Sequence, residues 1–170
     1  MTISAIAAQA ASAGFIAAVS WAGAMDLVTM KIRNSLVLIL LGLFALLAPL
    51  AGWSITEIGL SAAVASAMLV GTFTLFAFGW IGGGDAKLAP VVALWLGADN
   101  ASLYLIYSAI FGGVLTLALL QFRVMLLPAF CLNISWVARL HDRKTGVPYG
   151  VAIASAALFV YPSSHWANLI

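Results

Sequence analysis

Two aspartates stand out as candidate catalytic residues in an otherwise strongly apolar sequence. Asp26 ends the first long apolar stretch, and Asp85 directly follows the three glycines Gly82, Gly83 and Gly84. An acidic residue within or beside a membrane span costs about 3 kcal/mol on insertion scales, so each aspartate requires a reason. When two carboxylates lie close together, one can take a proton from water while the other donates a proton to a peptide carbonyl. The pair therefore predicts aspartic-protease chemistry, provided that the fold brings Asp26 and Asp85 together.

Each aspartate also has a purely structural interpretation. Asp26 can be a hydrated charge at the membrane boundary, although the negative end of a helix dipole disfavours a carboxylate there. Asp85 can cap the helix that follows it, and the glycines can be a flexible turn. Three successive glycines, however, leave backbone N–H and C=O groups unshielded, and exposed backbone can pair with an extended peptide. We therefore predict that Gly82, Gly83 and Gly84 bind substrate.

The composition places the chain in a lipid bilayer. Of its 170 residues, 65% are hydrophobic and 7% are charged, whereas a soluble domain carries about 25% charged residues. The net charge of +2 is too small and too dispersed to indicate a nucleic-acid partner. No Lys or Arg precedes the first apolar stretch, which argues against a signal peptide. We expect one domain, residues 1–170, of the all-α integral membrane class.

Six apolar segments are candidate transmembrane helices. A helix needs about 20 apolar residues to cross the hydrocarbon core of a bilayer. The predicted spans are residues 3–25, 35–53, 58–80, 85–97, 101–122 and 149–161. The fourth and sixth are short, so that a re-entrant segment is the alternative to a crossing for each. Residues 124–138 are apolar but contain Pro128, and we place them along the membrane surface.

The basic residues decide the predicted orientation. Short loops rich in Lys and Arg stay on the cytoplasmic side. With six crossings and the N-terminus outside, all seven Lys and Arg residues fall near that side. If the fourth segment did not cross, the basic residues would be divided between the two faces. The topology therefore puts Asp26 and Asp85 at the cytoplasmic ends of their helices, where they can meet.

Other ways of cleaving a peptide bond find less support. A zinc protease needs clustered ligands such as H-E-x-x-H, but His141 and His165 fall on opposite sides of the membrane in this topology. A serine protease needs a base near its serine, and no His or Lys lies well inside a span. Cys131 is the only cysteine, which excludes a cysteine-based zinc site. We therefore expect no metal and no cofactor.

Most of the basic residues are interpreted as topology anchors whose side chains reach toward lipid headgroups. Arg33 and Lys87 have a second possible role, because they closely follow Asp26 and Asp85 in the sequence. Their positive charge can attract an acidic group of a substrate. We therefore include both among the predicted substrate-binding residues.

The segment after Asp26 resembles the first motif of the type IV prepilin peptidases, which are G-x-G-D intramembrane aspartyl proteases. That motif is an Asp, five further residues and then Ile-Pro-Asn. The corresponding residues here are Asp26, Ile32 and Asn34, with Arg33 in place of the proline. The loop after the first span is therefore expected to differ locally from the family pattern.

Two further segments carry the same resemblance. Gly82, Gly84 and Asp85 match the G-x-G-D motif itself. A third patch opens the last span and resembles the short Flp, or tight-adherence, branch of these peptidases; it consists of Pro148, Tyr149, Gly150 and Ala152. The three motifs occur in the order expected for the family, from the first span to the last.

The resemblance implies removal of the short basic leader from Flp-type prepilins at the cytoplasmic face of the bacterial inner membrane. By the same resemblance, Asp26 and Asp85 would be the catalytic acids. Larger relatives also N-methylate the new terminus, using a cytoplasmic region with paired cysteines. This chain has one cysteine and no such insert, so we expect peptidase activity alone. The implied partners are a prepilin and the lipid bilayer; the pilin and the oligomeric state stay open.

A non-enzymatic function is the main alternative. In a small membrane transporter or pilus-assembly subunit, Asp26 and Asp85 would bind protons or cations, as acidic pairs in membranes do. A transporter site is expected near the membrane midplane between broken helices, whereas both aspartates here are predicted at one edge. The predicted position therefore favours the protease.

Overall fold

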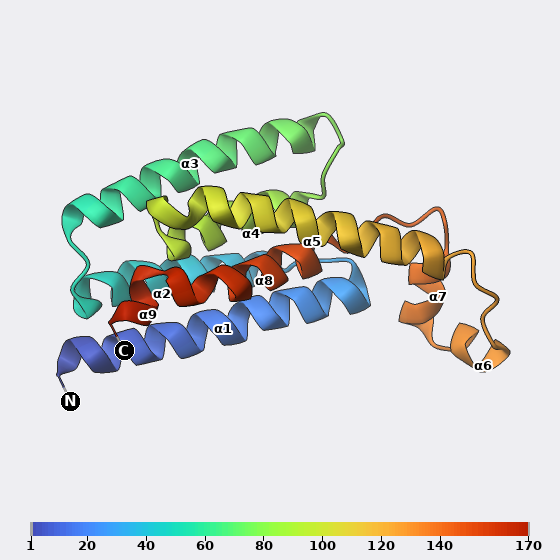
Figure 1. Cartoon of the computed structure of the whole chain (residues 1–170), viewed down its shortest axis with the longest axis horizontal. Coiled ribbons are helices and arrows are strands. Elements are labelled where there is room, and N and C mark those ends of the chain that lie inside the picture. The colour runs from blue at the N-terminus through green and yellow to red at the C-terminus, as the bar shows by residue number, and fades with distance from the viewer. Residues whose placement is uncertain (1, 170) are drawn as a thin grey trace.

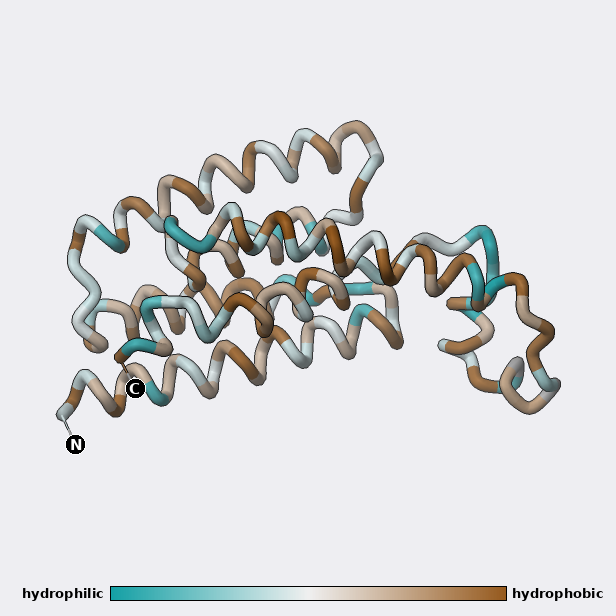
Figure 2. The backbone as a smooth tube through the Cα atoms, viewed as in Figure 1, coloured by the Kyte–Doolittle hydropathy of each residue, from teal (hydrophilic) through white to brown (hydrophobic). Residues whose placement is uncertain are grey.

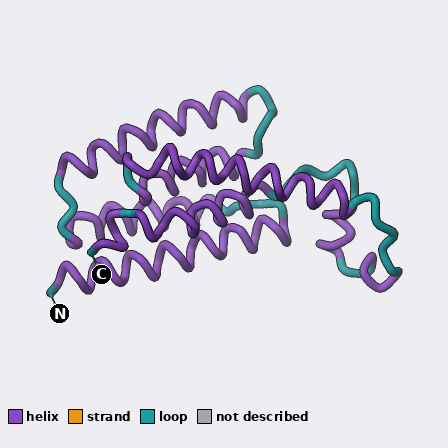
Figure 3. Tube along the Cα trace, in the orientation of Figure 1, coloured by secondary structure: helices purple, strands orange, loops and turns teal. Residues whose placement is uncertain are grey.

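The computed structural model describes residues 2–169, and every regular element in that range is a helix (Figures 1 and 3). The long helices are α1 (Ile3–Thr29), α2 (Asn34–Ala51), α3 (Ile55–Ala77) and α5 (Ala101–Phe122). The shorter ones are α4 (Gly83–Leu96), α6 (Ala129–Leu132), α7 (Ser135–His141), α8 (Tyr149–Val160) and α9 (His165–Asn168). Two 3₁₀ turns, Ala98–Asn100 and Tyr161–Ser163, follow α4 and α8.

The four long helices are the elements that can cross a membrane unaided. Each contains a strongly apolar stretch of at least 18 residues, and Figure 2 shows hydrophilic residues gathered mostly near helix ends and around α7. The predicted all-α membrane class is therefore confirmed. The orientation of the N-terminus stays a prediction.

The expected fourth and sixth crossings are shorter than the other spans. α4 has 14 residues and α8 has 12, which at 1.5 Å per residue gives lengths of about 21 and 18 Å. A hydrocarbon core is about 30 Å thick, so neither helix reaches across it alone. From Leu88 to Leu96, α4 is buried by the surrounding helices. That α4 and α8 complete six membrane crossings stays a prediction.

The helices α1 to α5 alternate in direction along the chain, so that α2 and α4 run parallel, and the bundle packs around α4 and α8 (Figure 1). α1 packs against α2 and α8, α5 packs against α8, and α4 contacts α2, α3 and α8 (Figure 1). α3 rests almost entirely on α4 and is otherwise exposed along its length. Because α1 and α3 end where α2 and α4 begin, the first and second sequence motifs lie at the same end of the bundle.

An aromatic cluster fixes the other end of α4. Trp95 stacks on Phe15 with a centroid distance of 5.1 Å, and Trp166 lies at the same distance from Trp95. The Trp95 indole N–H donates to the carbonyl oxygen of Leu40 at 3.0 Å, and that of Trp166 donates to the Trp95 carbonyl at 2.9 Å. These contacts tie α1, α2, α4 and α9 together and hold α4 in one position.

The segment between α5 and α8 folds against the aspartate end of the bundle. Arg123, which follows α5, donates to the carbonyl oxygens of Leu140 and Gly146, both at 2.8 Å. Arg139 of α7 donates to the carbonyl oxygen of Val28 at 2.8 Å. These bonds fix the chain that leads into α8. The expected position of residues 124–138 along the membrane surface stays a prediction.

Candidate active site

Asp26 lies in the last turn of α1 and is buried, with 6% of its surface exposed. α1 ends three residues later because Met30 adopts the left-handed conformation, with φ 55°, and its N–H donates to the Asp26 carbonyl oxygen at 2.8 Å. The side chain of Asp26 points away from this cap. Its Oδ2 accepts a hydrogen bond of 2.7 Å from the backbone N–H of Gly150.

Gly150 positions Asp26 through its lack of a side chain. A Cβ at Gly150 would lie 2.8 Å from Asp26 Oδ2 and 2.9 Å from Ile32 Cδ1, both too short for real contacts. Gly150 is also the second residue of α8, so its N–H has no partner within that helix. The positive end of α8 therefore holds the carboxylate that ends α1. The sequence motif contained Gly150, but its direct bond to Asp26 was not predicted.

Asp85 is the third residue of α4, with Gly82 as the N-cap. Its carboxylate turns back toward the Gly82 backbone, where an added Cβ would lie 2.9 Å from Oδ2. The structural role considered from the sequence was a helix cap, but the N-cap is Gly82 and no side chain caps α4; Asp85 is instead an acidic residue in the first turn, near the positive end of the helix dipole. Asp85 nevertheless lies on the same side of the bundle as Asp26, because both residues line one cavity.

The glycines before Asp85 are required for close packing. None of Gly82, Gly83 and Gly84 has a positive φ. A Cβ at Gly83 would lie 3.1 Å from the ring of Phe76, and one at Gly84 would lie 3.1 Å from Ile32. Side chains at these positions would push α3 and the α1–α2 loop away from the start of α4.

Asp26 and Asp85 line one cavity of about 270 Å³. Its wall is completed by the α1–α2 loop, residues Met30, Lys31 and Ile32, and by the three glycines. A water in bulk occupies about 30 Å³, so the cavity has room for the water and the short piece of backbone that hydrolysis requires. We call it the aspartate cavity. The structure therefore brings together the two predicted acids and the three predicted glycines.

The two predicted basic residues lie outside this cavity. Arg33 is exposed at the N-cap of α2. Lys87 is exposed on α4, and its Nζ donates to Asn34 Oδ1 at 3.1 Å. Lys31 is the basic residue that lines the aspartate cavity. Its position in the loop between Asp26 and Ile32 was the available sequence signal, and it was interpreted only as a topology anchor.

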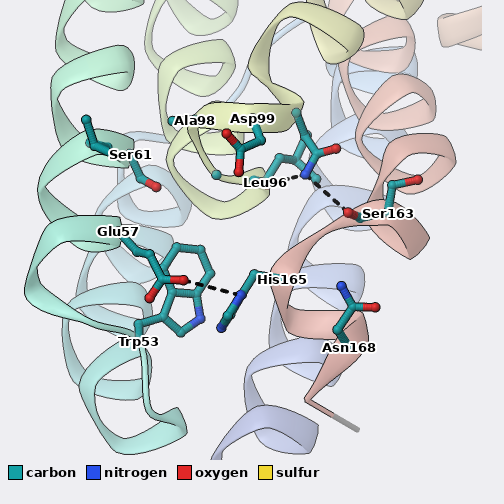
Figure 4. Close-up of a pocket in the computed structure, with 12 residues that line it drawn as sticks. Trp53, Glu57, Ser61, Leu96, Ala98, Asp99, Ser163, His165 and Asn168 are labelled. Atoms are coloured by element: carbon teal, nitrogen blue, oxygen red, sulfur yellow. Dashed lines mark hydrogen bonds and ion pairs between the residues drawn. The ribbon is translucent and has the colours of Figure 1, made fainter.

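A second polar pocket, of about 240 Å³, lies at the opposite end of α4, and we call it the distal pocket (Figure 4). Glu57 and His165 face each other across it at 3.6 Å. Glu57 also completes a capping box at the start of α3, accepting from the Ser54 backbone N–H and hydroxyl, both at 2.7 Å. Among the described residues, no group of three His, Cys, Asp or Glu side chains is arranged to hold a metal ion.

Comparison with known families identifies the family of this chain. The profile of the type IV leader peptidase family matches residues 13–117, more than half of the 170-residue chain. The matched region includes Asp26, the glycines and Asp85, whereas α8 lies beyond it. No significant match was found among curated proteins or among solved structures. The extent of the family match shows that this multi-pass membrane protein belongs to the type IV leader peptidase family.

Proposed function

We propose that this family member is an aspartic endopeptidase that removes the leader of a prepilin. The observation that carries the proposal is the aspartate cavity, which is lined by two carboxylates from helices far apart in the sequence. Within residues 2–169 neither carboxylate forms a salt bridge. Lys31 lines the cavity but forms a salt bridge with neither acid, so the two acids can share one proton, which is the requirement for activating a water between them.

The reaction needs only the two carboxylates, a water and the peptide. The ionised carboxylate takes a proton from the water, whose oxygen forms a bond with the scissile carbonyl carbon. The protonated carboxyl group gives its proton to the carbonyl oxygen, producing a tetrahedral intermediate. When the intermediate collapses, the C–N bond breaks and the leaving nitrogen takes the proton that the first carboxylate received from the water. A hydroxyl group of the intermediate returns its proton to the second carboxylate. Because the two groups exchange a proton, their titration belongs to the pair and neither is assigned as the acid.

The surroundings of the pair support this chemistry. The bond from Gly150 fixes the orientation of the Asp26 carboxylate, and the Asp85 carboxylate lies close to the Gly82 backbone. Pre-positioned groups lower the barrier because no reorganisation is needed during the reaction. The glycines of the cavity wall present backbone without side chains, so an extended peptide can lie against them.

The family supports a prepilin-type substrate and a membrane location, and the proposal extends both. The natural substrate would be a prepilin of the Flp type, cut at the cytoplasmic face of the inner membrane. Peptidase activity would occur without methyl transfer, since the chain carries the single cysteine Cys131. Lys87 and Arg33 would act from outside the cavity, on parts of the substrate beyond the scissile bond.

Co-expression with a short Flp-type prepilin tests the proposal. Mass spectrometry should detect a pilin shortened at its leader when the wild-type chain is present. Asp85→Asn, at the same level in the membrane, should leave the precursor intact. Leader removal by the Asp85→Asn protein, or proton or cation flux through the wild type without cleavage, would contradict the protease assignment.

A further inference from the structure

An apolar groove of about 360 Å³ runs between α2 and α3, with α4 as its floor. α2 and α3 both pack on α4 but hardly touch each other, which leaves the groove open along its length. Val37 and Leu41 of α2 form one wall, and Ala62 and Ser66 of α3 form the other. We call this feature the α2–α3 groove. It is separate from the aspartate cavity, with which it shares no lining residue.

The dimensions and lining of the α2–α3 groove suit an α-helix. Along α4 it extends from Lys87 to Leu94, a rise of about 10 Å or two helical turns. Small side chains on the α3 wall, such as Ala62 and Ser66, allow another helix backbone to come close. A bundle that is complete in itself would fill this space with its own side chains.

The groove has one charged residue, and it lies at the end nearest the aspartates. Lys87 is exposed, and its bond to Asn34 leaves donors free on its ammonium group. Every other lining side chain is apolar apart from the hydroxyl of Ser66. The complementary occupant is therefore an apolar helix with an acidic side chain near the end that lies beside Lys87.

The start of α4 connects the groove to the aspartate cavity. Asp85 and Lys87 are two positions apart, so they project about 200° from each other around the helix. A chain passing from one to the other must go around the start of α4, where Gly82 is exposed and has no side chain to obstruct it. The path half-way around a helix about 10 Å wide is about 16 Å long, which takes about five extended residues at 3.3 Å each.

We propose that the α2–α3 groove binds the membrane helix of the substrate, the segment that begins a few residues after the cleaved bond. An acidic side chain near the start of that helix pairs with Lys87. The bond to be cut is thereby held at the aspartate cavity, on the other side of the first turn of α4. This inference rests on the proposed function and adds the surface that recognises a membrane-anchored substrate.

Ser66→Trp tests the groove, with Ala67→Trp as its matched control. Ser66 lines the groove, whereas the equally exposed Ala67 follows it on α3 and lies outside. Each variant is assayed on a membrane-anchored prepilin and on a soluble peptide that spans the cleavage site but lacks the membrane helix. Ser66→Trp should lower kcat/KM for the anchored substrate by about tenfold, because an indole overfills the groove. It should leave cleavage of the peptide unchanged, and Ala67→Trp should affect neither.

Equal losses on both substrates would mean that Ser66→Trp disturbs the catalytic site, and no loss on either would mean that the groove is not used. Both results would overturn the inference. If the wild type cleaves neither substrate, the proposed function fails instead.

Crosslinking gives a readout that does not depend on the peptide. In a Cys131→Ser background, Ser66→Cys should form a disulfide with a cysteine in the first turns of the substrate helix, and Ala67→Cys should not. Cleavage of the anchored substrate without crosslinking at position 66 would show that lipid fills the groove and would also overturn the inference.

Discussion

The aspartate cavity and the distal pocket lie at opposite ends of α4, and both contain carboxylates, but these are held in different ways. In the distal pocket, Glu57 is bonded to Ser54, three residues away, and faces the imidazole of His165. In the aspartate cavity, Asp26 is held by Gly150, which is 124 residues away in the sequence. A local cap explains the distal carboxylate as part of helix α3. Asp85 is also held locally, beside the Gly82 backbone at the start of α4, but no local structure explains why Asp26 is brought to the same cavity.

The Glu57 carboxylate therefore stabilises the fold, whereas bringing Asp26 and Asp85 together costs stability. Placing two acids in one poorly hydrated cavity is unfavourable unless they share a proton. Groups of this kind are typical of catalytic sites, where the fold maintains an arrangement that local interactions would not select. Substitutions at the two ends should accordingly have different consequences. Those at the aspartate cavity should lower activity, and those at the distal pocket should lower stability.

The largest effect is expected from the two aspartates. Asp26→Asn and Asp85→Asn should each lower cleavage by about a thousandfold or more, and the double variant should be no worse than either single one. The two carboxylates act on the same water, so the loss of one already stops the step that needs both. Rates are measured with a matched prepilin in membranes containing equal amounts of each protein.

Independent roles would give a different pattern. If the double variant lost the product of the two single losses, the aspartates would contribute separately, and the shared-water mechanism would be wrong. Asn keeps the size of Asp, so normal membrane insertion of the variants serves as the control for folding.

A smaller but still large effect is expected for Gly150→Ala. The added methyl group would lie within 3 Å of Asp26 and Ile32, so α8 or the end of α1 must shift. A shift of about 1 Å in a catalytic group can lower the rate by about a hundredfold. Gly113→Ala in α5 is the control, because a Cβ there meets no atom within 4 Å. It should retain activity, and comparable activity of the two variants would show that the Gly150 contact is dispensable.

The sequence was sufficient to predict the parts of this site that depend on chemical type. Asp26 and Asp85 stand out because acids are costly in an apolar chain, and the membrane class follows from composition. Gly150 could not be assigned its role, because its bond to Asp26 joins two segments whose relative placement is a tertiary property. The shortness of α4 was visible in the sequence, but its burial among three helices was not.

Proximity in sequence misled the interpretation of Arg33 and Lys87 in one respect. Both follow an aspartate closely, yet neither lines the aspartate cavity. Lys87 lies two residues after Asp85 on a helix, and residues with that spacing face different directions. Arg33 caps α2 and points outside the cavity because the chain has already turned. The helical period explains the position of Lys87. The conformation of the α1–α2 loop explains that of Arg33, and the sequence did not predict this conformation because the family's proline is replaced.

Lys87→Gln should produce a moderate effect on cleavage. If Lys87 pairs with an acidic substrate group at an exposed position, its loss removes about 1 kcal/mol or less, equivalent to about a fivefold rise in KM. Arg33→Gln, at an exposed position that lines neither the cavity nor the groove, should raise KM less than Lys87→Gln does. The measurement is the initial rate as a function of substrate concentration. Rescue of Lys87→Glu by a substrate with Lys in place of its acid would identify the pair.

The smallest effect on activity is expected at the distal pocket, from Ser54→Ala. Removing the hydroxyl breaks the capping box of α3, in which Ser54 Oγ accepts from the Glu57 N–H at 3.2 Å. Loss of an N-cap of this type lowers the free energy of unfolding by about 1 kcal/mol. Cleavage should stay at the wild-type level, because α4, about 21 Å long at 1.5 Å per residue, separates the pocket from the aspartates.

Thermal unfolding in detergent and cleavage of the same preparation distinguish the two consequences of Ser54→Ala. A lower Tm with unchanged kcat/KM would support the division between a stabilising end and a catalytic end. Ser54→Asp provides the matched control, since Asp also caps helices and should restore most of the Tm. The opposite result, a large loss of cleavage with an unchanged Tm, would mean that a change at the start of α3 alters the glycine turn at its other end. α3 leads directly into that turn and rests almost entirely on α4, so this measurement decides whether the two ends of the bundle are independent.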